Sequence, residues 1–395
     1  MKGIKPQFFI LVLLVSFASV GAVLFTPALP SIATFFQVSV GKAQLAMTLY
    51  LVGYALGQLP YGPLANYYGR KKTLYIGICI SVIGSLLCAL SPHLMSFNLL
   101  LLGRFIQAIG ACVGLKVSFT MIADSFEQVA ATQMISKIII VFAIMPGIAV
   151  AIGGWITHYL SWESCFYFLV LFSFLVLWLV TRLPETAKKL DRKALNFSSI
   201  IHGYGVKFKN PRIVLSGIMM GCESTVVYIF ASKAPFIGIN LMGMTPETYG
   251  NYNFIPIIGM LLGAMLSAKL AGRFSVMGIV LYGSIASLVA AMTMFVPFLW
   301  GMLNPVTLFF PMFLIYLAEA MVYANVTSLG LAHSVNKSNG SAVLNFINLS
   351  MTVIAVLFAE FVHPESALLM PIGFLIFLSL LLILCYPLKK LSEST

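Results

Sequence analysis

Long apolar segments alternate with short polar ones along the whole chain of 395 residues. A membrane-spanning helix needs about 20 apolar residues, and apolar segments of that length recur from one end of the chain to the other. We therefore predict an all-α integral membrane protein with twelve transmembrane helices. They are expected at residues 8–35, 43–63, 73–91, 97–123, 130–158, 163–183, 212–238, 247–270, 276–298, 305–332, 339–361 and 367–388.

One long polar segment, residues 184–210, lies away from the chain ends and separates six predicted helices from six others. It predicts an N-terminal six-helix bundle at residues 1–183, a cytoplasmic linker at 184–210 and a C-terminal six-helix bundle at 211–395. Two six-helix halves around a central path are typical of secondary transporters that contain internal repeats.

The composition excludes a soluble protein. Hydrophobic residues make up 60% of the chain and charged residues 9%, whereas soluble domains carry about 25% charged residues. The net charge of +12 does not indicate nucleic-acid binding, because the basic residues alternate between loops as the positive-inside rule requires. An even number of helices then places both termini in the cytoplasm. The six cysteines have no metal-binding spacing and the chain has no glycine-rich nucleotide loop, so we expect no metal, no cofactor and no ATP-driven step.

The most informative polar stretch runs from Gly62 to Lys72, between the second and third predicted helices. Gly69 permits a tight turn there. The basic residues that follow, Arg70 and Lys71 with Lys72, are expected at the carboxyl end of the second helix, where the helix dipole favours cations. They also face the anionic inner leaflet, so a plain anchoring role for this stretch stays open.

Several stretches resemble the motifs of one transporter family, the major facilitator superfamily. Its signature loop is matched by Gly62, Leu64, Ala65, Gly69, Arg70 and Lys71. Its helix 4 motif resembles Arg104-Phe105-Ile106-Gln107 with Gly110, and the helix 5 motif of its antiporter branch resembles Pro146 with Gly153, Gly154 and Trp155. The bicyclomycin-resistance type of drug:proton antiporter is similar at Pro27-Ala28-Leu29-Pro30, at Gly57-Gln58-Leu59-Pro60 and at Leu160-Ser161-Trp162-Glu163.

This resemblance implies a monomeric transporter in the inner membrane of a bacterium. Such a protein moves a small molecule in exchange for protons by rocking two halves about a midplane site. Two positions depart from the family pattern. Asn66 occupies the place of the signature aspartate, which predicts a weaker cytoplasmic latch. Residues 21–27 lack the acid that related antiporters often carry in helix 1, so no proton carboxylate is assigned there.

Charged residues inside predicted membrane helices are functional candidates, because each costs about 2.5–3.5 kcal/mol even on lenient scales. In the N-terminal half these residues are the basic Arg104, Lys116 and Lys137, and all three are candidate substrate ligands. Each also has a structural alternative. Arg104 can pair with helix 1, Lys116 can pair with Asp124, and Lys137 lies near enough to its helix end to extend to the membrane surface.

In the C-terminal half, Glu223 and Glu319 lie deep in the seventh and tenth predicted helices. Burial favours the protonated form of a carboxyl group, so either residue is a candidate proton carrier. The alternative is that they neutralise a buried cation such as Lys233. Lys233 and Glu360 themselves are expected at the periplasmic rim.

Uncharged polar side chains are expected to complete the cavity, and Tyr54, Asn325 and Asn345 are the strongest candidates. The others are Tyr50, Gln58, Asn251, Asn253, Tyr316, Tyr323 and Asn348. The fifth and eighth predicted helices also concentrate proline and glycine, which favours a moving interface between closely packed helices. The residues concerned are Pro146, Gly147, Gly153 and Gly154 in one helix and Pro256, Gly259 and Gly263 in the other.

The leading hypothesis is proton-coupled efflux of a small organic molecule. The alternative is import or export of an anionic polycarboxylate, such as a carboxylate siderophore or a metabolite, because the charges predicted for the N-terminal half of the cavity are all positive. A non-transporting receptor or a channel is a remote alternative, since nothing in the sequence resembles a sensory domain or a selectivity filter.

Overall fold

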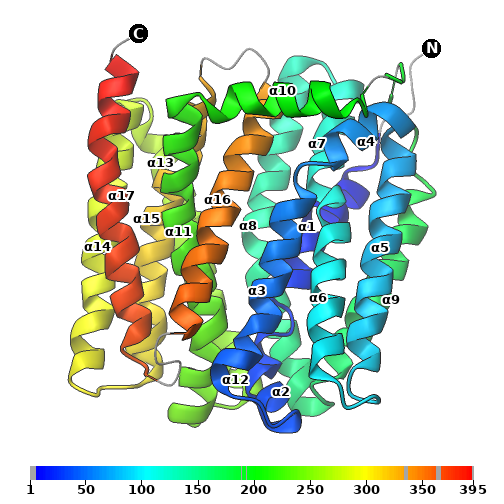
Figure 1. The fold of residues 1–395 in the computed structure, drawn as a ribbon. Helices are drawn as coiled ribbons and strands as arrows, with labels where there is room; N and C mark the ends of the chain where they lie inside the picture. The colour runs from blue at the N-terminus through cyan, green and yellow to red at the C-terminus, as the bar shows by residue number, and fades with distance from the viewer. Residues whose placement is uncertain (1–5, 188, 193, 333–336, 362–365, 394–395) are drawn as a thin grey trace. The chain divides into compact units, whose positions relative to one another are not determined.

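The computed structural model describes residues 6–187, 189–192, 194–332, 337–361 and 366–393, and these residues form helices and no strands (Figure 1). The first helices are α1 (Phe8–Val23), η1 (Thr26–Ala28), α2 (Leu29–Phe35), α3 (Val40–Gly57), α4 (Tyr61–Tyr68), α5 (Arg70–Leu90), α6 (Phe97–Ala111), α7 (Val113–Ser125), α8 (Gln128–Tyr159) and α9 (Ser164–Val180). They are followed by α10 (Phe197–Phe208), α11 (Pro211–Pro235), η2 (Phe236–Leu241), α12 (Pro246–Tyr252), α13 (Phe254–Leu270), α14 (Val276–Leu299), α15 (Pro305–Leu331), α16 (Lys337–Phe361) and α17 (Leu369–Glu393).

The described residues include 10 helical spans that are long and apolar enough to cross a membrane. The segment Ser164–Val180 is a shorter apolar helix, and α3 with α4 occupies the second predicted span. Each predicted helix therefore corresponds to one helix, or to consecutive helices, of the structure. This agreement confirms the all-α membrane fold with twelve spans.

Interruptions divide several helices that hydropathy predicts as continuous. The first predicted helix is broken between α1 and η1, the second at residues 58–60 and the fourth at Cys112. Proline accounts for two of these breaks, because Pro27 and Pro60 lack the backbone N–H that would continue the helical ladder. The seventh predicted helix passes from α11 into η2, a short π-helix.

The stretch predicted as a loop after the second helix is mostly helical. Since α4 ends at Tyr68 and α5 begins at Arg70, the connection is Gly69 alone. Gly69 has a φ of 91°, which a residue without a Cβ adopts readily. The expectation that Arg70 and its neighbours end the second helix is wrong, because they form the first turn of α5. The dipole disfavours cations there, and the Glu185 carboxylate offsets this by accepting the backbone N–H groups of Arg70 and Lys71 at 3.0 and 3.1 Å.

The chain forms two compact units. Unit 1 comprises the described residues of Met1–Phe25 and Leu49–Gly203, and unit 2 those of Thr26–Thr48 and Tyr204–Thr395. Unit 2 therefore includes η1, α2 and the first part of α3, which come from the N-terminal half of the sequence. The predicted boundaries at residues 183 and 211 stay a prediction, and the linker predicted between them contains the helix α10.

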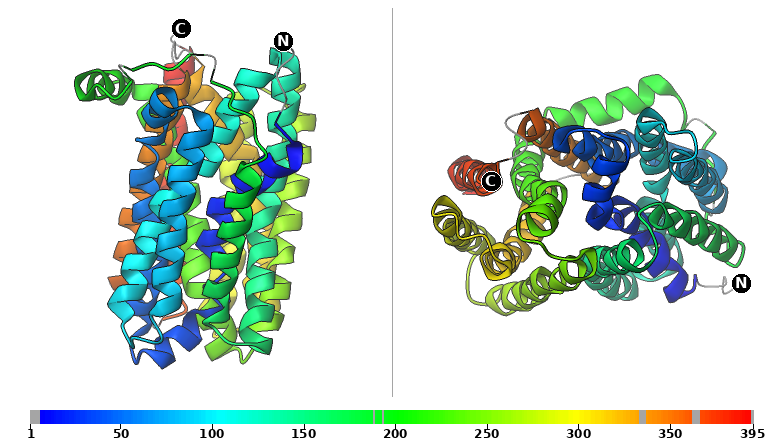
Figure 2. Two further views of the ribbon diagram at one scale, coloured as in Figure 1. Left: turned by 90° about the vertical axis from the view of Figure 1, so that its right-hand side faces the viewer. Right: turned by 90° about the horizontal axis from the view of Figure 1, so that it is seen from below.

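Each unit is built from long helices that pack along their sides, seen nearly end on in the right panel of Figure 2. In unit 1, α5 packs against α6 and α9, and α1 packs against α8. In unit 2, α15 packs against α13 and α14, and α11 packs against α16 and α17. The central positions of α1, α11 and α15 in these contacts place their side chains in the interior of each unit.

Three of the glycines predicted to mark a moving interface lie in close packing inside a unit. Gly259 and Gly263 of α13 lie against the main-chain oxygens of Phe313 and Leu317 in α15, and Gly153 of α8 lies against Leu24. A Cβ at any of the three would overlap those main-chain atoms. These glycines therefore permit helix packing within a unit, and a moving interface at helices 5 and 8 stays a prediction.

Candidate substrate and proton sites

Arg104 lies at the centre of a buried polar network in unit 1. Its side chain is fully buried, and its Nη1 and Nη2 atoms donate to the carbonyls of Gly21 and Ala22 at 2.7 and 3.2 Å. Nη1 also donates to Gln107 Oε1 at 2.6 Å, and Gln107 Nε2 donates to Ser85 Oγ at 2.8 Å. Arg104 thus supplies donors to carbonyls of the last turn of α1, which lack partners in the helix itself.

Two aromatic rings enclose the Arg104 guanidinium. Its Cζ atom lies 4.1 Å from the ring centroid of Phe25 and 4.2 Å from that of Tyr50. Tyr50 in turn donates its hydroxyl to the carbonyl of Ala18 at 2.7 Å. Such contacts stabilise a desolvated cation by about 2 kcal/mol. The contacts match the structural alternative, pairing with helix 1, and a substrate would have to displace them in order to bind Arg104.

Lys116 and Cys112 donate hydrogen bonds to main-chain carbonyls next to the break between α3 and α4. Lys116 Nζ donates to the carbonyl of Gln58 at 2.9 Å, and Cys112 Sγ donates to the carbonyl of Tyr54 at 2.9 Å. Both carbonyls lie at the end of α3, where helical carbonyls lack intrahelical donors. Tyr54 therefore contributes its main-chain carbonyl to this polar contact, while its ring packs against apolar residues of unit 1.

Asp124 is paired with Arg70 of the signature stretch. Its Oδ2 atom accepts from Arg70 Nε at 2.8 Å and from Thr186 Oγ1 at 3.2 Å. The expected pairing of Lys116 with Asp124 is therefore wrong. Arg70 contacts Asp124 and Glu185 across 54 and 115 residues of sequence. Sequence reasoning missed both contacts, because no local spacing relates these residues.

The position that departs from the signature, Asn66, is exposed. Its main-chain oxygen accepts from the backbone N–H of Asp191 at 3.0 Å. This bond ties the end of α4 to the segment that follows α9. A weaker cytoplasmic latch at Asn66 stays a prediction.

The remaining predicted substrate ligands lie in different places. Lys137 is exposed on α8. Asn325 Nδ2 donates to Met321 O at 2.6 Å and to Ser267 Oγ at 3.0 Å, which links α15 to α13. Asn345 Nδ2 donates to Ser341 O at 3.0 Å within its own helix. Both amides therefore use their NH₂ groups inside unit 2, and their role as substrate ligands stays a prediction.

Glu223 of α11 and Glu319 of α15 lie close together in unit 2, near enough for their charges to interact. Glu223 is 1% exposed and Glu319 is 9% exposed. Neither carboxyl oxygen of Glu223 has a hydrogen-bond partner among the described residues, and the ion pairs found among those residues include neither glutamate. Since an unpaired buried carboxylate costs several kcal/mol, protons are the natural means of neutralising this pair.

Two tyrosine side chains of α15 interact electrostatically with the glutamate pair. Tyr316 and Tyr323 of α15 lie within electrostatic reach of Glu319, and Tyr323 also lies within reach of Glu223. The Tyr323 hydroxyl accepts from Asn348 Nδ2 of α16 at 3.1 Å. Hydroxyl groups can both donate and accept hydrogen bonds, so these tyrosines give the two carboxyl groups a polar setting inside the helix bundle.

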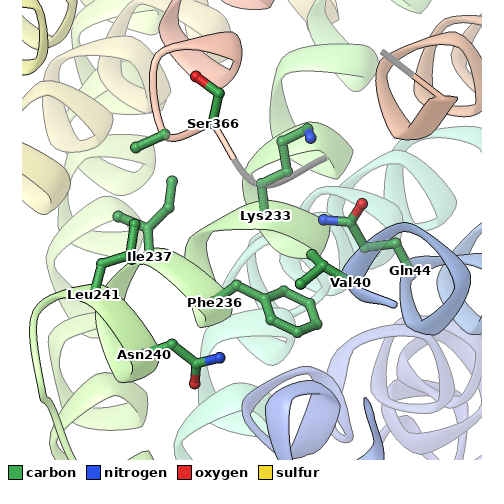
Figure 3. Close-up of a pocket in the computed structure, with 9 residues that line it drawn as sticks. Val40, Gln44, Lys233, Phe236, Ile237, Asn240, Leu241 and Ser366 are labelled. Carbon is green, nitrogen blue, oxygen red and sulfur yellow. The ribbon is translucent and has the colours of Figure 1, made fainter. Parts of the chain in front are cut away.

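Lys233 does not neutralise the glutamate pair. It lies ten residues after Glu223 on α11, which is about 15 Å along the helix axis and too far for a direct ion pair. Lys233 lies in the last turn of α11, where it is 3% exposed and lines a cavity (Figure 3), and its place at the periplasmic rim stays a prediction. The side chain of Glu360, the other predicted rim residue, lies outside the described part of the chain.

Comparison with known proteins places the chain in a family. Residues 11–359 match the family model of the Major Facilitator Superfamily. An uncharacterized transporter of Rickettsia bellii is 30% identical over 350 residues, which cover 82% of this chain and 84% of that protein. The multidrug transporter MdfA of Escherichia coli O157:H7 is 27% identical over 266 residues, 67% of this chain and 64% of that protein. A bicyclomycin resistance protein homolog of Haemophilus influenzae is 25% identical over 252 residues, 63% of this chain and 62% of that protein.

Solved structures share the fold. A crystal structure of a D-xylose-proton symporter aligns with a TM-score of 0.77 at 15% identity, over 97% of this chain and 96% of the other. The inward open conformation of the xylose transporter XylE from E. coli aligns with a TM-score of 0.75 at 12% identity, over 97% of this chain and 95% of the other. The family model spans most of the sequence, and the fold agrees with it. The chain therefore belongs to the major facilitator superfamily of membrane transporters.

Proposed function

We propose that the protein is a proton-coupled exporter of a small organic molecule in the bacterial inner membrane. The observation that carries the proposal is the buried pair of Glu223 and Glu319, which has no cation beside it among the described ion pairs. Export is supported by relatives that are named a multidrug transporter and a bicyclomycin resistance protein homolog.

The proposed coupling follows from the charges of the pair. Two adjacent buried carboxylates repel each other, so the pair retains a proton while it is shielded from water. When unit 2 opens toward the cytoplasm, water reaches the carboxyl groups and they release a proton. When it opens toward the periplasm, where protons are more abundant, they are reloaded. Substrate leaving in the second state and protons leaving in the first give net exchange.

The orientation in this proposal places both termini in the cytoplasm. The basic residues of the segment between α9 and α11 include Arg182, Lys189, Lys207 and Lys209, and such residues gather on the cytoplasmic side of membrane proteins. A single chain contains all the groups that the proposal uses, so we expect a monomer.

The alternative, transport of an anionic polycarboxylate, has less support. It depended on Arg104 and Lys116, together with Lys137, as cavity cations. Arg104 and Lys116 donate to main-chain carbonyls at breaks in neighbouring helices, and Lys137 is exposed on α8. A polycarboxylate would need several free cations at one place.

The proposal is tested with purified protein in proteoliposomes that carry an imposed pH gradient. Ethidium serves as a cationic probe and benzenesulfonate as an anionic one. We expect gradient-dependent accumulation of at least one probe, and at least a tenfold loss of it in Glu223→Gln and in Glu319→Gln. Glu393→Gln is the control, because Glu393 pairs with Lys389 at the exposed end of α17 and should leave transport unchanged. Wild-type accumulation in both test variants would show that the coupling assignment is wrong.

A further inference from the structure

Glu319 has a tyrosine one turn away in each direction along α15. Tyr316 precedes it by three residues and Tyr323 follows it by four. Residues at these spacings share a helix face, with about 5–6 Å between their Cβ atoms. Long side chains on a helix point back toward its N-terminus, so the Tyr323 ring lies over the turn that contains Glu319. The electrostatic interaction between Tyr323 and Glu319 agrees with this placement.

The Tyr323 hydroxyl is bonded to a neighbouring helix. Asn348 of α16 is 3% exposed, and its Nδ2 atom donates to the hydroxyl at 3.1 Å. Thr352, one turn further along α16, donates to the main-chain oxygens of Asn348 and Gly221 at 2.9 and 3.5 Å. Gly221 lies two residues before Glu223 on α11. These bonds link α16 to both of the helices that carry the glutamates.

The direction of the bond between Asn348 and Tyr323 decides what the hydroxyl can do. The amide presents its NH₂ group to the tyrosine, and its Oδ1 atom has no hydrogen-bond partner among the described residues. Because the phenol oxygen accepts this bond, its own hydrogen stays available for another acceptor. The carboxyl groups of Glu223 and Glu319 lie within electrostatic reach of Tyr323. A hydrogen bond to an ionised acceptor is roughly twice as strong as one between neutral groups, so the hydroxyl favours a carboxylate over a protonated carboxyl group.

We propose that Tyr323 donates its hydroxyl hydrogen to the carboxylate that forms when the glutamate pair releases a proton, and that Asn348 positions the hydroxyl for this bond. The charge forms on Glu319, which is 9% exposed against 1% for Glu223, because a charge is less costly where water reaches it. The bond stabilises the deprotonated pair, so the proton leaves at a lower pH than it would without Tyr323. This role presupposes the proposed function of the pair as proton carrier.

Other titratable groups also face the glutamates or the tyrosines beside them. They are Cys222 and Tyr228 of α11, Tyr249 of α12, Tyr316 of α15 and Cys385 of α17. Phenols and thiols are ordinarily uncharged at neutral pH, so these groups supply no cation to the carboxylate. The charged residues of the packed helices lie near helix ends, namely Arg212 and Lys233 of α11, Lys269 of α13, Lys337 and Glu360 of α16, and Lys389, Lys390 and Glu393 of α17.

The test titrates the purified full-length protein in lipid and follows the infrared C=O stretch of protonated carboxyl groups. The part of the signal that is lost in Glu223→Gln and in Glu319→Gln belongs to the pair. We expect Tyr323→Phe to move the titration of this part to higher pH by at least about one pH unit, the equivalent of one lost hydrogen bond to a charged group. Tyr282→Phe is the matched control, because Tyr282 is an exposed tyrosine of α14 in the same unit, and it should titrate as the wild type does.

The positioning role of Asn348 has its own variants. Asn348→Leu should move the titration in the same direction as Tyr323→Phe but by less, since the hydroxyl is present and no longer held. The double variant should move it no further than Tyr323→Phe alone, because Asn348 acts through Tyr323. An additional shift in the double variant would overturn the positioning role. Thermal unfolding confirms that each variant is folded, and the shift in Asn348→Leu carries the test if Tyr323→Phe is not.

The infrared titration requires no transport, so it distinguishes the Tyr323 bond from the proposed coupling. An unchanged titration in the folded Tyr323→Phe variant, or a pair signal that does not titrate, would overturn the Tyr323 bond. A shifted titration together with wild-type accumulation of the transport probes in Glu223→Gln and Glu319→Gln would support the bond and contradict the coupling.

Discussion

The guanidinium of Arg104 donates to the carbonyls at the end of α1, on a helix more than 80 residues earlier in the chain. The sequence indicates that such a deep charge needs a partner, and helix 1 is one of the two alternatives it leaves open. It does not indicate that the partners are main-chain oxygens, because their availability depends on where α1 breaks. The same holds for Lys116, because the main-chain carbonyl of its partner Gln58 is available as an acceptor only where the helix breaks after α3. Gly69 was predictable, since the need for a positive φ is local.

Replacement of Arg104 by lysine should destabilise unit 1. A lysine keeps the charge but cannot reproduce the planar fork that binds Gly21, Ala22 and Gln107 together. We expect the free energy of unfolding to fall by about 2 kcal/mol, the typical value of a lost charged hydrogen bond. Thermal unfolding in detergent measures this, with Arg273→Lys as the control at an exposed position. A variant with wild-type stability but weakened probe binding would identify Arg104 as a ligand.

At the scale of the helices, apolar length predicts where each span lies, because the bilayer demands about 20 apolar residues of every one. It does not predict the breaks at residues 58–60 or at Cys112. An interrupted helix is tolerated where neighbouring side chains satisfy the freed carbonyls, and Cys112 Sγ and Lys116 Nζ do so for the second helix. Hydropathy also placed Arg70 in a loop at the end of the second predicted helix, whereas it begins α5. The reason is that the eight-residue helix α4 and the single residue Gly69 after it are together as polar as a loop.

The close packing of α13 on α15 gives a prediction for single glycines. A Cβ at Gly263 would overlap the carbonyl oxygen of Leu317, whereas a Cβ at Gly272 would meet nothing within 4 Å. Gly263→Ala should therefore lower the free energy of unfolding by about 1–3 kcal/mol, as overpacking usually does. Gly272→Ala is the matched control and should have no such effect in the same thermal unfolding assay. Equal stability of the two variants would show that α13 and α15 can move apart without lowering the free energy of unfolding.

At the scale of the whole molecule, composition and span length were sufficient to predict a transporter fold with twelve helices, and the family motifs agree with it. The glutamate pair was predictable only as two separate candidates, because the contact between α11 and α15 is a tertiary feature. The Lys233 cavity was not predictable, since it combines α11 with residues of α3 that lie in the other half of the sequence. Unit 2 thus contains both the proposed proton carriers and this cavity.

The most direct test of the central claim, that Glu223 and Glu319 carry the coupled protons, compares two kinds of transport in the same proteoliposomes. One is accumulation of a probe driven by a pH gradient, and the other is exchange of labelled for unlabelled probe at equal pH. A protein that has lost only its proton carrier still exchanges substrate but cannot accumulate it. We predict that Glu223→Gln and Glu319→Gln retain exchange and lose accumulation. Gradient-driven accumulation at the wild-type level in both variants would contradict the account.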